Sequence, residues 1–190
     1  MESQQLIEPC QLLIRLHPNH FLDDPLFQGE KDYITKLAER NPHVHLVEPV
    51  PLGGDLGYYS GEDMPEKSSM MAYSDIFLTV YSTMVVEASI HATPIVSICL
   101  DVPEGWGVEN RFYLPLSTIG NWPTHKRFID SGAGRVALST AELKEHLNTY
   151  LRSPEIDLEK QRKFIEDECT YVDASAGRRT AGFLLSLIRQ

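Results

Sequence analysis

Ser82 and Thr83 form the hydroxyl pair whose place in the sequence points most directly to chemistry. They follow the apolar run Asp75–Val80 and precede an apolar segment that contains Glu87. Hydroxyls at a strand-to-helix junction lie beside free backbone N–H groups, and this combination suits a phosphate or a diphosphate. Ser and Thr are also ordinary helix N-caps, so capping alone is the alternative. The pair is a candidate anion site.

Glu87 lies four residues after Thr83, one helical turn further along the same face. A carboxylate at this place can accept two hydrogen bonds from vicinal hydroxyls, such as those of a ribose. The segment Met84–Ile90 around it is otherwise apolar, and a buried carboxylate needs a partner. The alternative is a favourable charge near a helix N-terminus. We predict that Glu87 binds ligand hydroxyls.

His17 is the third candidate, because it follows a predicted strand and precedes a proline that restricts the loop. A neutral imidazole can donate to a phosphoryl oxygen, and a protonated one also offsets its charge. A structural role is the alternative for a lone histidine. Arg15 points to the same side of the strand by the period of two and could support the phosphates. No metal is predicted, since no metal-ligand spacing with a second ligand is found at His43, His45, His91, His125 or His146.

Four short apolar runs predict the strands that must position these side chains. They are Gln11–Leu16, Val44–Glu48, Asp75–Val80 and Pro94–Leu100, and each is continuous in the manner of a buried strand. Helical segments between them imply right-handed crossovers, and hence a parallel sheet with helices on both faces. We expect at least four strands in one sheet. Ligands bind beyond the carboxyl ends of such strands, where the candidate residues gather.

Capping signals and apolar periodicity predict the helices, with boundaries good to a few residues. They cover residues 25–40 after an Asp24 cap, 63–73, 83–92, 139–151, 153–169 and 175–190. The C-terminal third is therefore helical, and residues 101–134 are predicted to be loops that leave room for short pieces of regular structure. Asp173 or Ser175 is expected to cap the last helix, with Arg178 and Arg179 available to an anion or to surface acids. Gly53-Gly54 matches no phosphate-binding loop and predicts only a mobile turn.

Size and charge restrict the class of protein. The chain has 190 residues with 42% hydrophobic content, enough for one domain with a real core. Its net charge of −10 repels polyphosphate backbones, so a nucleic-acid binder is not expected. Three scattered cysteines indicate neither a disulfide framework nor a zinc site. With no signal peptide and no membrane-spanning run, we expect a cytoplasmic protein, with peripheral membrane contact compatible with it.

Several of these segments together resemble glycosyltransferase-B-type enzymes. Ser74–Ala88 resembles their strand–turn–helix a-D-(apolar)-T-x-x-S-(T/S)-x-x-x-E-A, and Ala92–Val96 resembles the g-x-P-(apolar) that follows. Leu13–Pro18 is similar to the R-x-H-P strand end of the CDP-glycerol glycerophosphotransferase and capsule-polysaccharide branch. Asp173–Arg179 looks like the D-G-x-(S/A)-x-R start of the last helix. The resemblance covers roughly residues 11–100 and 170–189.

The resemblance implies half of a glycosyltransferase-B fold, namely the Rossmann-like lobe that binds the nucleotide-activated donor. Residues 1–190 would be one nucleotide-sugar-binding domain of an enzyme of surface or capsular polysaccharide synthesis. By position, Ser82 and Thr83 would lie by the donor phosphates, Glu87 by the ribose, and His17 would face the diphosphate. No cofactor or metal is implied, and no catalytic residue is assigned. UDP-N-acetylglucosamine 2-epimerases share this layout, so an epimerase-like half is an alternative function.

Two departures from that pattern matter. Val80-Tyr81-Ser82-Thr83 stands where glycerophosphotransferases usually have Asp-Tyr-Ser-Ser, and Glu87 where they often have Asp, which favours a sugar nucleotide over a glycerol-phosphate donor. The chain also begins almost at the R-x-H-P strand, so an N-terminal acceptor lobe or a partner protein is expected to complete it. A non-catalytic interaction module is the alternative. An exposed, apolar strand edge is then expected beside Gln11–Leu16 or Val44–Glu48.

Overall fold

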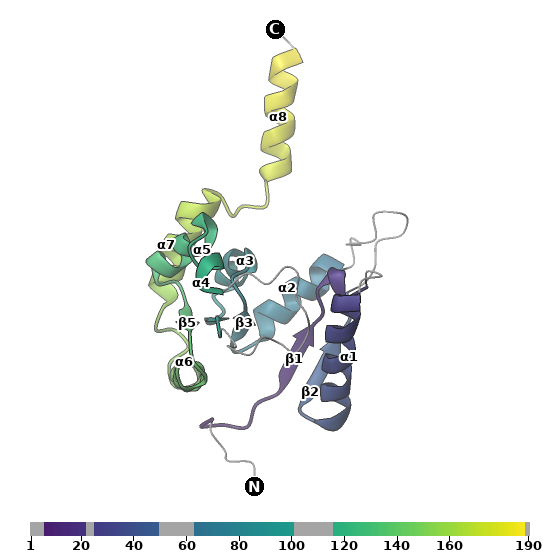
Figure 1. The fold of residues 1–190 in the computed structure, drawn as a ribbon. Helices are drawn as coiled ribbons and strands as arrows, with labels where there is room; N and C mark the ends of the chain where they lie inside the picture. Colours follow the sequence, from purple (N-terminus) through teal and green to yellow (C-terminus); the bar gives the residue numbers. More distant parts are fainter. Residues whose placement is uncertain (1–5, 22–24, 50–62, 101–115, 189–190) are drawn as a thin grey trace.

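The protein has the predicted α/β architecture, with parallel strands and a helical C-terminal third (Figure 1). The computed structural model describes residues 6–21, 25–49, 63–100 and 116–188. Its strands are β1 (Leu12–Arg15), β2 (Val44–Val47), β3 (Phe77–Thr79), β4 (Ile95–Ile98) and β5 (Arg135–Ala137). Its helices are the 3₁₀ turn η1 (Pro18–Phe21), α1 (Pro25–Arg40), α2 (Asp63–Tyr73), α3 (Met84–Ile90), α4 (Leu116–Ile119), α5 (Pro123–Ser131), α6 (Thr140–Arg152), α7 (Leu158–Cys169) and α8 (Ala176–Ile188).

The main core forms on the two faces of the parallel sheet β3-β4-β5. Ile95 and Val96 are adjacent in β4, so their side chains point to opposite faces, and both are fully buried. Ile95 packs with residues of α2, α3, α5 and α7, whereas Val96 packs with Tyr150 of α6. Helices therefore cover both faces of this sheet, as the sequence predicts.

The first two strands form a separate and less buried unit. β1 and β2 pair in parallel, with Leu12 opposite Val44, and α1 packs beside them (Figure 1). Among the described residues β1 pairs only with β2, and Leu12 and Leu13 are 39% and 47% exposed. The expected exposed, apolar strand edge is present here. The expected single sheet of four or more strands is wrong for the described residues, since the strands divide into a sheet of two and a sheet of three.

The segment predicted to be loops is partly regular. α4 and α5 lie within residues 101–134, and β5 follows directly. α5 begins at Pro123, a favoured first helical residue, and Gly132 follows its last residue with a positive φ of 64°. Both residue types are typical of helix ends, so the sequence indicates where this helix starts and stops. The predicted cap Asp24, the predicted turn Gly53-Gly54 and the residues that directly follow the predicted strand Pro94–Leu100 lie outside the described residues.

A buried carboxylate holds α6 and α7 together behind the sheet. Asp157 accepts hydrogen bonds from the Tyr150 hydroxyl and the Lys160 ammonium, both at 2.9 Å, and forms an ion pair with Arg135 at 3.3 Å. Burial acts to raise the pKa of Asp157, but the bonds from Lys160 and Tyr150 and the charge of Arg135 leave that pKa below its ordinary value. The helix predicted to start near Ser153 begins at Leu158 instead, after a turn over residues 154–157 that contains Asp157.

Gly134→Ala tests how tightly β5 is packed against the core. A Cβ atom at residue 134 would lie 2.6 Å from the ring of Phe128 and 2.8 Å from the carbonyl oxygen of Ile95. We expect the substitution to lower the free energy of unfolding by about 1–3 kcal/mol, measured by urea denaturation. Gly29→Ala is the matched control, since open space surrounds residue 29 in α1, and it should stabilise the protein by about 0.5–1 kcal/mol. Equal effects at both positions would contradict the packing described.

Candidate functional site

The turn that joins β3 to α3 carries the predicted hydroxyl pair and is conformationally strained. Tyr81 has a φ of 33°, which bulky side chains rarely adopt. Its backbone N–H donates to the hydroxyl of Ser97, a fully buried residue of β4, at 3.2 Å. Its ring lies against His125 and against Gly120, where a Cβ would come within 2.5 Å of the phenol oxygen. Tight packing from three sides therefore holds this turn in its strained form.

Ser82 and Thr83 differ in what they do at this turn. The Ser82 hydroxyl oxygen accepts from the backbone N–H of Met84, the first residue of α3, at 3.1 Å, while Ser82 itself lies one residue before the N-cap residue Thr83. That bond leaves the hydroxyl hydrogen of Ser82 able to donate elsewhere. The Thr83 side chain makes no capping bond and is exposed. Both hydroxyls can therefore donate to a ligand at the end of β3.

Arg15 at the end of β1 forms a buried ion pair with Asp63, the first residue of α2. The Asp63 side chain is fully buried, and 13% of the Arg15 side chain is exposed. The carboxylate of Asp63 thus makes a long-range contact with the guanidinium of Arg15. A buried carboxylate needs such a partner, so this pair fixes α2 against β1.

Glu87 is bound in the same way by the next turn of α2. Its Oε2 atom lies 2.8 Å from the Nζ atom of Lys67, whose side chain is 11% exposed. Because Asp63 and Lys67 are four residues apart, one face of α2 carries both partners. The carboxylate of Glu87 is 39% exposed and can still be reached from solvent. Lys67 adds an ammonium that could contact a phosphate beside Glu87.

His17 follows β1 and sits next to the turn η1. Burial and the neighbouring His20 lower the pKa of His17 below its ordinary value of 6.5. The imidazole is therefore biased towards its neutral form, which donates from one ring nitrogen only. Burial also lowers the pKa of His125, whose ring packs between Tyr81 and Trp122.

The structure brings two of the predicted site residues to one helix. Arg15 and Glu87 contact adjacent turns of α2 on the same face, Arg15 from the carboxyl end of β1 and Glu87 from the start of α3. Ser82 and Thr83 lie one turn before Glu87. His17 belongs to the β1–β2 unit, whereas the hydroxyl pair follows β3 of the other sheet. The site is therefore an arc of alternating charges along α2, with hydroxyls at one end.

Sequence reasoning missed Asp63 and Lys67 as members of this arc. Their spacing of four residues on a predicted helix was visible, but their partners lie 48 and 20 residues away in the chain. Asp173, which with Ser175 was a predicted cap, accepts from the Arg179 guanidinium and from the backbone N–H of Ser175, which precedes α8. These bonds hold the pKa of Asp173 at about 2.

The described residues include no group of three or more His, Cys, Asp or Glu side chains that could hold a metal ion. Among the same residues, no helix is both long and apolar enough to cross a membrane. No model of a known protein family matches the chain, and no curated protein matches it in sequence. The arguments for function therefore come from the residues themselves and from the resemblance of their motifs.

Asp63→Asn tests whether α2 is held by charge. The substitution leaves a largely buried guanidinium without its counter-charge, so we expect the free energy of unfolding to fall by about 3–5 kcal/mol in urea denaturation. Asp130→Asn is the control, because it breaks a solvent-exposed pair with Lys126 and should cost less than about 1 kcal/mol. A combined Arg15→Met and Asp63→Leu variant should recover most of the loss. Equal losses for Asp63→Asn and Asp130→Asn would contradict the assignment.

The lowered pKa values of His17 and His125 predict that acid destabilises the fold. Between the pKa in the folded protein and 6.5, the unfolded chain binds more protons than the folded chain. The free energy of unfolding therefore rises as the pH rises through that range and decreases as the pH falls. Urea midpoints at pH 5 and pH 7.5 measure the difference. His125→Phe keeps a ring beside Tyr81 but does not titrate, so it should reduce the difference. An unchanged difference would contradict a role for His125.

Proposed function

We propose that this chain binds a nucleotide-diphosphate sugar, as the donor half of a glycosyltransferase of surface or capsular polysaccharide synthesis. One observation carries the proposal: two residues chosen from the sequence, Arg15 and Glu87, meet on a single helix at the strand ends, one turn from the predicted hydroxyl pair. Ligands of parallel α/β sheets bind at such strand ends. The resemblance of the motifs supplies the ligand class.

Each group has a distinct chemical role in this proposal. The hydroxyls of Ser82 and Thr83 donate to the diphosphate, and the ammonium of Lys67 and the guanidinium of Arg15 offset its charge. Glu87 accepts from the ribose hydroxyls through the oxygen that Lys67 does not hold. His17, biased towards its neutral form, donates one hydrogen bond to a phosphoryl oxygen. Local donors do this work, because the net charge of the chain is −10.

Catalysis would require groups from an acceptor-binding lobe or a partner protein. Among the described residues the arc contains one carboxylate that is part-exposed, and Lys67 already binds it. This arrangement suits holding a donor more than moving a proton. We therefore propose donor binding as the activity of this chain alone, with group transfer as the activity of the completed protein.

A non-catalytic interaction module is the second candidate, and the ion pairs favour it. Both acids of the arc, Asp63 and Glu87, have basic partners, so the arc satisfies its own charges without a ligand. In that case α2 serves only to join the two sheets. Measurement of nucleotide binding separates the two candidates.

Titration calorimetry with UDP, CDP and GDP tests the proposed function. At least one of the three should bind, and Glu87→Ala should weaken binding by about ten- to a hundredfold, the loss of one charge-assisted hydrogen bond of about 1.5–3 kcal/mol. Absence of binding by all three would overturn the donor-binding proposal and leave the interaction module.

Lys67→Met is the matched variant, since it breaks the same ion pair as Glu87→Ala but keeps the carboxylate. If Glu87 binds the ribose, a nucleoside without phosphates should be bound equally by Lys67→Met and the unmodified chain, and more weakly by Glu87→Ala. Equal weakening by both variants would mean that the ion pair only shapes the site, and would contradict the ribose role.

A further inference from the structure

Helix α8 projects away from the rest of the described chain (Figure 1). None of its residues, all of which the structure describes, is buried. Its five large apolar side chains are each more than half exposed: Phe183, Leu184, Leu185, Leu187 and Ile188. At 100° per residue, Phe183, Leu187, Leu184, Ile188 and Leu185 follow one another around more than half of the helix. A helix with so broad an apolar surface is stable only when another surface covers it.

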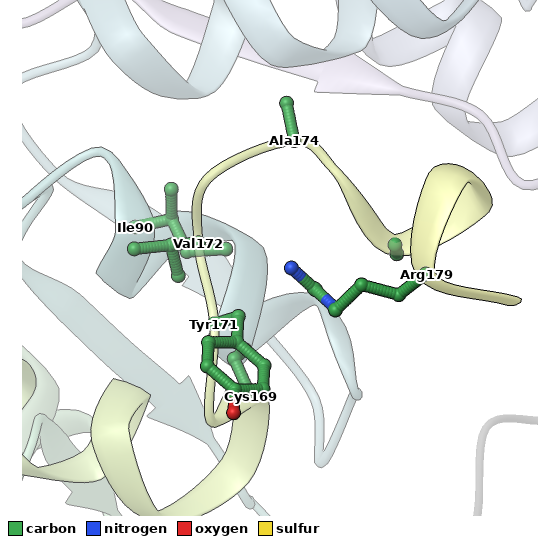
Figure 2. A pocket seen from close by; sticks show the side chains of 7 residues that line it. Ile90, Cys169, Tyr171, Val172, Ala174 and Arg179 are labelled. Carbon is green, nitrogen blue, oxygen red and sulfur yellow. The ribbon is translucent and has the colours of Figure 1, made fainter. Parts of the chain in front are cut away.

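An apolar hollow of about 270 Å³ lies at the base of this helix. Figure 2 shows its lining, with Ile90 of α3 and Val172 on one side and Tyr171 below them. Arg179 reaches across from the first turn of α8, 4.3 Å from the centre of the Tyr171 ring. Ile90, Tyr171 and Val172 are all large, apolar and about half exposed or more. The hollow is thus a second apolar surface without cover in the described part of the chain.

The hollow fits side chains of a protein better than a small molecule. Small-molecule sites usually measure about 300–1,000 Å³ and place several polar groups towards the ligand. Here the only charged side chain among the described lining residues is Arg179, and Asp173 already binds it at 2.8 Å. A pair of large aliphatic side chains would fill this space without needing a polar partner.

The far end of α8 cannot reach the hollow at its own base. Ala176 and Arg179 in the first turn line that hollow, whereas Ile188 is 12 residues further on, about 18 Å along the axis. Asp173 accepts from Ser175 and Arg179 and so fixes the direction in which the helix leaves. One chain therefore carries an apolar helix end and an apolar hollow that can meet only between two molecules.

We propose that α8 pairs antiparallel with α8 of a second copy of this chain, and that its C-terminal end occupies the hollow at the base of the other helix. This arrangement is self-complementary, as a two-fold dimer requires. Each helix then covers the apolar surface of the other. It also places Arg178 and Arg179 of one copy near the C-terminal end of the other helix, where positive charge is favourable.

The available area suits a modest dimer. Fully burying one large apolar side chain removes about 60–120 Å² of surface from water. Each copy offers eight such side chains, five on α8 and three at its base. Given their present exposure, burying them would remove about 300–600 Å² of accessible surface per copy, or about 600–1,200 Å² for the dimer. Specific interfaces begin near about 1,200 Å². We therefore expect association that depends on concentration, with a dissociation constant of micromolar order.

A membrane surface is a poorer match for α8 than a second copy. Interfacial helices carry a strongly charged polar face. The polar side of α8 instead consists of Arg178, Gly182 and Ser186 beside Arg179, which Asp173 neutralises. The net charge of the whole chain is −10, and this charge repels anionic lipid. A bilayer surface also could not fill the hollow.

Sedimentation of the full chain across a hundredfold concentration range tests the proposal. The unmodified chain should change from monomer to dimer, and Leu184→Glu should raise the dissociation constant at least tenfold. Ser186→Glu adds the same charge on the opposite side of the helix and should leave association unchanged. A monomer at every concentration, or equal effects of the two variants, would overturn the proposal. Since no residue of α8 is buried, both variants should melt like the unmodified chain at concentrations where the unmodified chain is a monomer.

Disulfide trapping tests the geometry directly, because Cys169 lines the hollow. In a Cys10→Ser background, Leu187→Cys should form an oxidised dimer with copper phenanthroline, and adding Cys169→Ser should abolish most of it. Trapping that does not depend on Cys169 would overturn the proposed antiparallel arrangement. A second result would also overturn the proposal: the chain binds phosphatidylserine vesicles, Leu184→Glu abolishes that binding, and no dimer forms in solution. That result would assign α8 to a membrane surface.

Discussion

The ion pair between Arg15 and Asp63 is the contact on which the arrangement of the two sheets depends. It fastens the start of α2 to the end of β1, while Lys67 one turn later binds Glu87 of α3. The end of α2 is fixed in turn, since Thr93 donates to the carbonyl of Met71 at 2.7 Å. In the described part of the chain α2 is thus bonded to β1 of one sheet, to α3, and to Thr93, two residues before β4 of the other sheet. A change at either ion pair acts on the relative position of the sheets as well as on the candidate site.

Much of the fold could be predicted because the signals were local. The run around Ile95 and Val96 predicts a strand buried on both faces, and the structure buries both side chains completely. The run Gln11–Leu16 has the same character but forms a strand whose leucines are part-exposed. Whether a strand is covered depends on elements far away in sequence, and an apolar run does not carry that information. β3 and β5 have three residues each, but β3 lies in the predicted run Asp75–Val80, whereas β5 lies at the end of a segment without a long apolar period and was missed.

The same distinction between local and long-range information applies to the candidate site. Ser82, Thr83 and Glu87 could be chosen because a hydroxyl pair and a lone carboxylate stand out at a strand-to-helix junction. Their partners could not, since Lys67 contacts Glu87 only after α2 and α3 pack together. The strain at Tyr81 was also unreadable, because a positive φ at an aromatic residue follows from tertiary packing and not from residue preference.

The unequal burial of the two sheets has a consequence for motion. Residues of β4 lie in the interior, while β1 and β2 present part-exposed side chains, and each strand has one unpaired edge in the described structure. The β1–β2 unit should therefore open at a lower free-energy cost than the β3-β4-β5 unit, as a separate cooperative unit in hydrogen exchange. Each opening would release Arg15 from Asp63. A ligand that bridges Arg15 and Glu87 would then slow exchange throughout β1 and β2, including backbone groups that it never touches, and part of its binding free energy would be spent on keeping that unit closed.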